Sequence, residues 1–199
     1  VSTVTEKYLS TRPWFTEMGH LVPSHRYKNE DIKNLAIRTC QTLGITRGVA
    51  HVEIKIKGDQ LYVIEAAARP GGDAIMDLVE NAYDMNPYQL HISMYINNTV
   101  KSANISTQKR TSAIAFLKAK KGKIQNINYP DIANDSEIKK VNLLKGIGDN
   151  VTDPENWSSR EGLVQFSWPE LSTTKTFKHI HKANELASKI FDCSDAHHD

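Results

Sequence analysis

Apolar and polar positions recur along the chain in patterns that predict both helices and strands. The clearest helix follows Asn29, a residue type that favours helix N-caps. Glu30 and Asp31 come next and suit the positive end of a helix dipole, and Gly44 supplies a stop. The apolar or small residues between these limits recur at helical spacing: Ile32, Leu35, Ala36, Thr39, Cys40 and Leu43.

Other elements of the first half follow from the same patterns. Two alternating segments flank the turn residues Lys57-Gly58-Asp59-Gln60, and turn residues between two β-rich runs predict a hairpin. The expected order is a strand at 13–22, the helix after Asn29, hairpin strands at 48–56 and 61–66, a loop at 67–73, and short helices near 74–82 and 87–96.

The second half differs in character. Residues 98–110 are polar and lack periodicity, so we expect a linker between a first part at 1–97 and a small α+β part at 111–199. The whole chain is thus predicted to be α+β. In the second part we expect strands at 111–118, 123–127, 137–144 and 163–168, and a helix at 172–191.

Composition narrows the class of protein. The 199 residues hold 25 Lys and Arg against 23 Asp and Glu, a balance without the basic excess of a nucleic-acid-binding protein. Apolar runs are far shorter than the about 20 residues of a bilayer span, so no membrane partner is expected. The two cysteines lie far apart, which favours a reducing compartment, and we expect the protein to be cytoplasmic.

The candidate chemistry centres on two carboxylates of the predicted hairpin. Glu53 and Glu65 lie on its two strands, and folding about the turn can place them side by side on one face. Adjacent carboxylates repel one another unless a cation lies between them, and oxygen ligands of this kind suit Mg²⁺. The alternative is that both are solvated residues of an exposed strand face.

The loop after the hairpin could bind an anion. Arg69 leaves the second strand and could bond a phosphate or carboxylate with its forked N–H groups. Gly71 and Gly72 permit a close backbone approach, so that their N–H groups could hold an anion.

These segments, "GVAHVEIKI" and "LYVIEAAARPGGDAIMDLV", resemble the C-terminal part of ATP-grasp ligases, especially the carboxylate–amine and dipeptide ligase branch. The resemblance implies that Glu53 and Glu65 hold Mg²⁺ ions that bridge ATP phosphates. It also implies that Arg69 stabilises the transferring phosphoryl group and that Gly71 and Gly72 position a carboxylate substrate. The fold implied is the C-terminal part of an ATP-grasp fold, an antiparallel sheet with packed helices plus a small β-rich lobe.

A further segment, "FTEMGHLVPS", is similar to a strand of the same family. By this resemblance, Glu17 and His20 face an amino-acid pocket, although a polar pair near a strand end is an equal alternative. The activity implied is ATP-dependent ligation of a carboxylate to an amine through an acyl phosphate, with ATP, Mg²⁺ and a small amino-acid or other carboxylate as partners. Arg69 is the expected catalytic residue.

Two departures from the family pattern bear on the predicted branch of the family and on the predicted activity of this chain. Ala67 stands where many ATP-grasp enzymes have a metal-binding Asn, which points toward the dipeptide-ligase branch. The segments that normally form the N-terminal part of the family do not precede this region, and the sequence begins at Val1. We therefore expect a C-terminal piece of a longer ligase that is inactive by itself. A homodimer is a possible partner arrangement. The alternatives are a non-catalytic metal- and nucleotide-binding module, or a biotin-carboxylase or carbamoyl-phosphate type of ATP-grasp enzyme.

Overall fold

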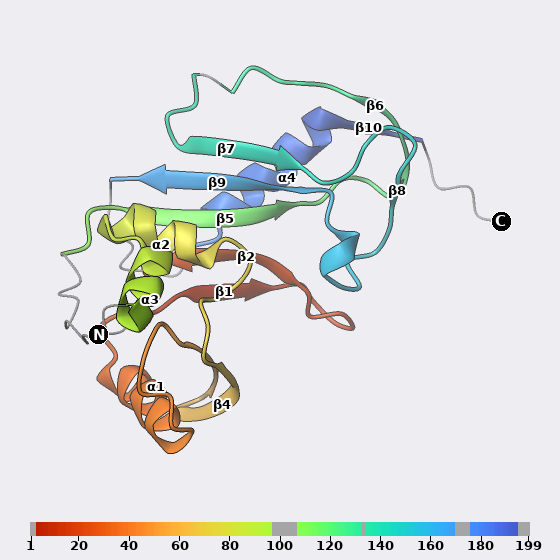
Figure 1. Cartoon of the computed structure of the whole chain (residues 1–199). Helices are drawn as coiled ribbons and strands as arrows, with labels where there is room; N and C mark the ends of the chain where they lie inside the picture. Colours follow the sequence, from red (N-terminus) through yellow and green to blue (C-terminus); the bar gives the residue numbers. More distant parts are fainter. Residues whose placement is uncertain (1–2, 97–106, 133, 170–175, 195–199) are drawn as a thin grey trace.

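The computed structural model describes residues 3–96, 107–132, 134–169 and 176–194, and its centre is a five-stranded antiparallel sheet (Figure 1). Within the part described, no helix is long and apolar enough to cross a membrane. The strands of the central sheet, in spatial order, are β1 (Glu6–Leu9), β2 (Glu17–Val22), β5 (Thr111–Leu117), β9 (Gly162–Trp168) and β7 (Ile138–Leu143).

The middle strand, β5, is buried along its whole length because helices cover both faces of the sheet. Helix α4 (Lys178–Ile190) packs on one face against Ala113 and Ala115, and α2 (Ile75–Tyr83) packs on the other against Ile114 and Phe116. A strand covered on both sides needs apolar residues at nearly every position, and the run Ala113–Leu117 provides them. Figure 1 shows α2 and α4 on opposite sides of this sheet.

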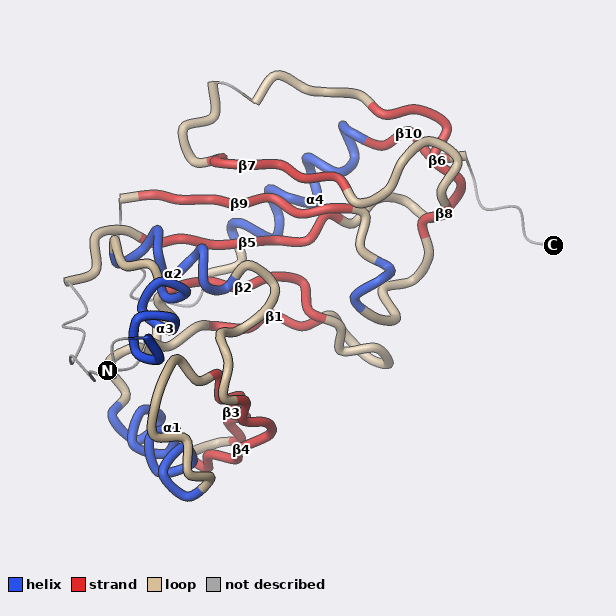
Figure 2. Tube along the Cα trace, in the orientation of Figure 1, coloured by secondary structure: helices blue, strands red, loops and turns tan. Residues whose placement is uncertain are grey.

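A smaller unit of one helix and one hairpin lies beside the sheet. Helix α1 (Glu30–Thr42) packs on the hairpin of β3 (His51–Lys57) and β4 (Gln60–Ala67) (Figure 2). The Asn29 side chain accepts hydrogen bonds from the backbone N–H groups of the first helical turn, as the cap pattern predicts. The helix after Asn29 and the 57–60 hairpin turn are therefore confirmed.

The remaining elements connect and flank these units. Helix α3 (Pro87–Ile96) follows α2, and both short helices were expected. A second sheet of three short strands consists of β6 (Gly122–Ile127), β8 (Asn150–Val151) and β10 (Phe191–Cys193), and a short 3₁₀ helix spans Trp157–Ser159. The expected α+β class and the antiparallel arrangement are confirmed.

Three details differ from the sequence prediction. Strand β1 was not predicted, because four residues are too few to show alternation. It forms by pairing with β2. Strands β8 and β10 are shorter still. The last helix begins at Lys178, and the expected start at 172 lies outside the described residues. The helix ends at Ile190, because the next residue, Phe191, pairs with Ile127 of β6.

The central sheet joins the two parts that were expected on either side of 98–110. Strands β1 and β2 precede that segment, whereas β5, β7 and β9 follow it, and β2 pairs directly with β5. Most of the predicted linker lies outside the described residues, and the division into domains stays a prediction. The shared sheet nevertheless allows residues from both ends of the chain to meet at one site.

Candidate active site

The hairpin places the two predicted metal ligands opposite each other. In the pairing of β3 with β4, Glu53 is the direct partner of Glu65, as the sequence predicted. Directly opposed residues of an antiparallel pair have Cβ atoms about 5 Å apart and share a face. The register shifts immediately after Glu53, so the simple alternation expected along β3 is interrupted at this point.

Lys7 links the hairpin to the central sheet. Its Nζ lies 2.8 Å from Oε1 of Glu53 and 2.7 Å from Oε1 of Glu17. Burial lowers the pKa of Lys7, but its bonds to the two carboxylates outweigh burial and raise the pKa overall. Burial likewise raises the pKa of Glu53, whereas the hydrogen bond and charge of Lys7 lower it, and the net pKa is lowered. Lys7 therefore stays charged between the side chains of Glu17 and Glu53.

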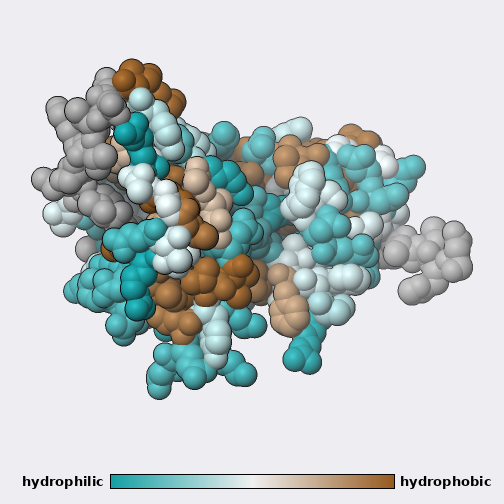
Figure 3. Space-filling model, turned by 60° about the horizontal axis from the view of Figure 1, so that its bottom comes forward, coloured by the Kyte–Doolittle hydropathy of each residue, from teal (hydrophilic) through white to brown (hydrophobic). Residues whose placement is uncertain are grey.

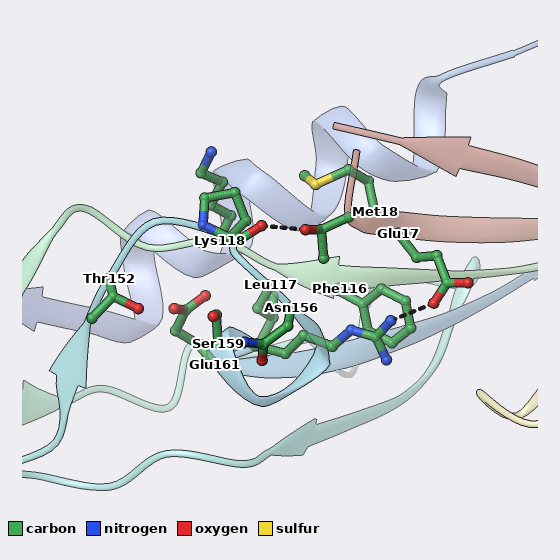
Figure 4. Close-up of a pocket in the computed structure, with 12 residues that line it drawn as sticks. Glu17, Met18, Phe116, Leu117, Lys118, Thr152, Asn156, Ser159 and Glu161 are labelled. Atoms are coloured by element: carbon green, nitrogen blue, oxygen red, sulfur yellow. Dashed lines mark hydrogen bonds and ion pairs between the residues drawn. The ribbon is translucent and has the colours of Figure 1, made fainter. Parts of the chain in front are cut away.

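Arg160 continues the network from the far end of the chain. Its Nη2 lies 2.8 Å from Oε2 of Glu17, and its Nη1 donates to Oδ1 of Asp73 at 2.8 Å. Nη2 also reaches Oδ2 of Asp73 at 3.3 Å, so that one guanidinium bonds both carboxylates. The guanidinium carbon stands 3.5 Å from the centre of the Phe116 ring, within cation–π range. Figure 4 shows the Glu17 carboxylate directed at this guanidinium beside Phe116.

His20 lies behind this carboxylate pair. It is 1% exposed, and its Nε2 stands 3.7 Å from Oδ2 of Asp73, which is longer than a hydrogen bond. The pKa of Asp73 lies far below its usual value, because His20 and the N–H groups of Arg160 favour the carboxylate more strongly than burial disfavours it. Glu17 and His20, predicted together from the sequence, are thus on one side of the same network.

The glycine loop meets the network through His51. The Nε2 of His51 lies 3.4 Å from Oε1 of Glu53, and a Cβ added to Gly71 would lie 2.9 Å from the other ring nitrogen of His51. Only a residue without a side chain can approach His51 so closely. Gly72 has open space around it, and Arg69 is exposed with its Nη1 donating to the Pro70 carbonyl.

The structure therefore brings some of the predicted site residues into contact and leaves others apart. Glu17, His20, Glu53 and Gly71 meet in one network. In the described part of the chain, Glu65 and Arg69 make no ion pair, although Glu65 lies opposite Glu53. A carboxylate and a guanidinium that are exposed beside a charged network are available to a ligand.

The network carries more negative than positive charge. Apart from the histidines, Glu17, Glu53 and Asp73 outnumber the cations of Lys7 and Arg160 by one. Glu65, at the edge of the network, increases the excess. A surplus of opposed carboxylate oxygens fits a hard divalent cation such as Mg²⁺, and Glu53 with Glu65 are the residues that could hold it.

A second group also has the spacing of a metal site. Ligand atoms of Glu17, His20 and Asp73 all lie within 4.8 Å of one another. The guanidinium of Arg160 bonds the carboxylates of Glu17 and Asp73, and Lys7 also bonds Glu17. Their negative charge is therefore already compensated by protein side chains. We assign no metal to this group.

Two hollows border the network. The cavity beside Glu17 and Arg160 in Figure 4 measures about 20 Å³, room for about one water molecule. An open groove of about 610 Å³ runs between α1 and β4 and reaches Glu65, a volume within the usual range of small-molecule sites. Figure 3 views the molecule from the side that carries α1 and the hairpin, and apolar side chains gather there. The groove is lined by Leu35, Arg38, Thr39, Thr42, Leu43, Val63, Ile64, Glu65 and Ala66.

Comparison with known proteins yields matches by structure alone. No protein-family model and no curated protein sequence matches the chain. Among known structures it is similar to phosphoribosylglycinamide synthetase from Anaerococcus prevotii, with a TM-score of 0.71 and 21% identity over 85% of this chain and 44% of that one. It is also similar to L-amino acid ligase from Bacillus licheniformis, with a TM-score of 0.70 and 23% identity over 89% of this chain and 48% of that one. The chain has an ATP-grasp fold.

The ATP-grasp fold is shared with further structures at lower similarity. A biotin carboxylase from Campylobacter jejuni gives a TM-score of 0.56 with 15% identity over 89% of this chain and 39% of that one. The chain spans less than half the length of each of these three proteins. The ATP-grasp resemblance read from the motifs is therefore confirmed at the level of the fold.

Sequence reasoning missed three members of the network. Lys7 lies on the short strand that alternation does not reveal. Asp73 stood in the quoted loop motif, but its role depends on Arg160, which lies 87 positions further along the chain. No local pattern links residues so far apart, and Arg160 in "SREGL" gave no signal beyond a charged residue before an apolar strand.

Proposed function

We propose that the chain is the C-terminal, metal- and substrate-binding portion of an ATP-dependent ligase that joins a carboxylate to an amine. The observation that carries the proposal is the pairing of Glu53 with Glu65 at the edge of a network that contains Glu17 and His20. The ATP-grasp fold supports an ATP-dependent ligase, and the network adds residues of the chemical types that such a reaction requires.

In this proposal Glu53 and Glu65 hold Mg²⁺, and the groove along Glu65 accommodates the nucleotide. Leu43, Val63 and Ile64 offer apolar surface to a base. The metal would neutralise charge on the phosphate oxygens. Lys7 Nζ lies 2.8 Å from Oε1 of Glu53 and competes with the metal for that oxygen.

The glycine loop is the proposed place for the substrate carboxylate. Backbone N–H groups of Gly71 and Gly72 can approach an anion closely, and the exposed guanidinium of Arg69 can bond a carboxylate or a transferring phosphoryl group. The carboxylate oxygen attacks the γ-phosphorus of ATP, ADP leaves, and an acyl phosphate results. An amine then attacks the acyl carbon, forming the C–N bond and releasing phosphate, while Glu17 and His20 orient an amino-acid substrate.

The test is phosphate release by the full-length protein with MgATP and single or paired amino acids, compared with bicarbonate as the acceptor. We expect amino-acid-dependent phosphate release that Glu65→Ala abolishes, because the variant loses a metal ligand. Lys121→Met is the matched control, since it removes an exposed ion pair to Asp153 and no residue of the network. Unchanged turnover in Glu65→Ala would refute the metal assignment.

The choice of acceptor separates the proposal from its nearest alternative. Release that depends on bicarbonate and not on any amino acid would contradict amine ligation and favour carboxylase-type chemistry, which the similarity to biotin carboxylase makes worth testing. Release in neither condition, by a protein shown to bind MgATP, would support a binding module without turnover.

A further inference from the structure

Arg160 is a nearly buried cation with partners from two distant parts of the chain. Its side chain is 9% exposed, and its guanidinium lies against the Phe116 ring of the central strand β5. Burial of a guanidinium costs free energy, which bonds from its N–H groups to carboxylates offset. Two of its nitrogens bond Asp73, at the end of the glycine loop, and one of these also bonds Glu17, at the start of β2.

The loop that Arg160 contacts has a backbone that needs support. Asp73 and Ala74 have φ values of 51° and 56°, in the left-handed region that residues with side chains rarely adopt. Two successive residues of this kind cost free energy, and surrounding contacts must hold them. The Asp73 carboxylate is held by both terminal guanidinium nitrogens of Arg160.

The same guanidinium also keeps two carboxylates together. Glu17 and Asp73 would repel each other if Arg160 were absent, and the loop would move away from β2. Gly71 and Gly72 directly precede Asp73, so any movement of Asp73 carries their N–H groups with it. Gly71 lies close to His51 on its other side, and Asp73 is bonded to Arg160.

We propose that Arg160 is a positioning residue that fixes the Gly71-Gly72 loop against β2 through Asp73 and Glu17, and thereby sets the affinity for the carboxylate substrate. The proposal rests on the proposed function for its substrate, and on geometry alone for the fixing of the loop. The forked guanidinium bonds both oxygens of Asp73 and also Glu17, and a Lys ammonium cannot reproduce that planar arrangement.

The first test needs no activity. Amide hydrogen exchange is measured in Arg160→Met, Arg160→Lys and the control Lys121→Met. We expect the amide of Ile75, which donates to the Gly72 carbonyl at 2.9 Å, to exchange about tenfold faster in Arg160→Met, with an intermediate effect in Arg160→Lys, while the β5 amides stay protected. The Lys121→Met control is expected to match the wild type. Unchanged loop exchange in a folded Arg160→Met protein would overturn the proposal.

The second test uses phosphate release by the full-length protein. Arg160→Met is expected to raise KM for the carboxylate substrate about tenfold and to leave KM for MgATP within about twofold, because Glu53 and Glu65 are untouched. A merely structural role would raise both KM values or lower the folded fraction alone, and that result would overturn the proposal. If Arg160→Met does not fold, Arg160→Lys is the variant that tests the proposal. Wild-type amide exchange in the loop together with a wild-type KM for the carboxylate substrate would then overturn the proposal.

The two tests separate the inference from the proposed function. A wild-type protein without phosphate release for any acceptor refutes the proposed function, yet the exchange rates still show whether Arg160 holds the loop. Faster loop exchange together with an unchanged carboxylate KM would refute the link to substrate affinity in an active enzyme.

Discussion

Acid should destabilise this protein through a histidine that is buried without a hydrogen bond. His179, on α4, is 1% exposed, and neither ring nitrogen has a partner among the described residues. Its ring packs edge-on against Tyr8 of β1, and the charges of His20 and His181 also act on its pKa. Burial, helped by those two histidines, lowers the pKa of His179 from 6.5 to about 3.

The size of the effect follows from that difference in pKa. Below pH 6.5 the unfolded chain binds a proton at this position and the folded chain does not, so falling pH favours unfolding. The stability is fully present above pH 6.5 and is lost progressively as the pH approaches the folded-state pKa. Each pH unit in this window costs about 1.4 kcal/mol, so a change from pH 7 to pH 5 should lower the free energy of unfolding by about 2 kcal/mol.

The assay is urea unfolding at pH 7 and pH 5 in the wild type and in His179→Leu. Other groups also contribute to the pH dependence, so the quantity of interest is the difference between the two proteins. The wild type should lose about 2 kcal/mol more than the variant. Lys189→Gln is the matched control, because that side chain is exposed on the same helix, and it should behave as the wild type. Equal losses in wild type and His179→Leu would refute the reasoning.

Two further substitutions test the packing and the network. Gly19→Ala should lower the free energy of unfolding by about 3 kcal/mol or more in urea titrations, because the new Cβ would lie 2.3 Å from the Ile114 carbonyl oxygen. A urea midpoint of unfolding equal to that of the wild type would contradict the close approach of β2 to β5. Lys7→Met should tighten Mg²⁺ binding about fivefold in calorimetry, because the ammonium group that bonds Glu53 and Glu17 is lost. Weaker Mg²⁺ binding by the variant would show that Lys7 supports the site and does not compete with the metal.

The sequence predicted most elements whose residues interact locally. The cap at Asn29, the helical spacing that follows and the 57–60 turn depend on neighbours within a few positions, and all three are present. Strand β1 could not be predicted, because four residues carry no period and their conformation depends on pairing with β2. Local rules succeed where local contacts decide the structure.

The candidate site was predictable to the extent that motifs carry it. Glu53 and Glu65 were expected to face each other, and the hairpin register confirms that they do. Lys7 and Arg160 could not be predicted, since each acts only through carboxylates that the fold brings from distant positions. Their discovery required the shared sheet, in which strands from both halves of the chain lie side by side.

The central claim is that Glu53 and Glu65 form a metal and phosphate site, and its most direct test is calorimetric titration with Mg²⁺ and a non-hydrolysable ATP analogue. The titration compares the wild type with Glu53→Gln/Glu65→Gln, which removes both charges and keeps both side-chain shapes. We predict magnesium-dependent binding of the analogue by the wild type and its loss in the double variant, with the fold of both confirmed by circular dichroism. Equal binding by the folded double variant would contradict the account.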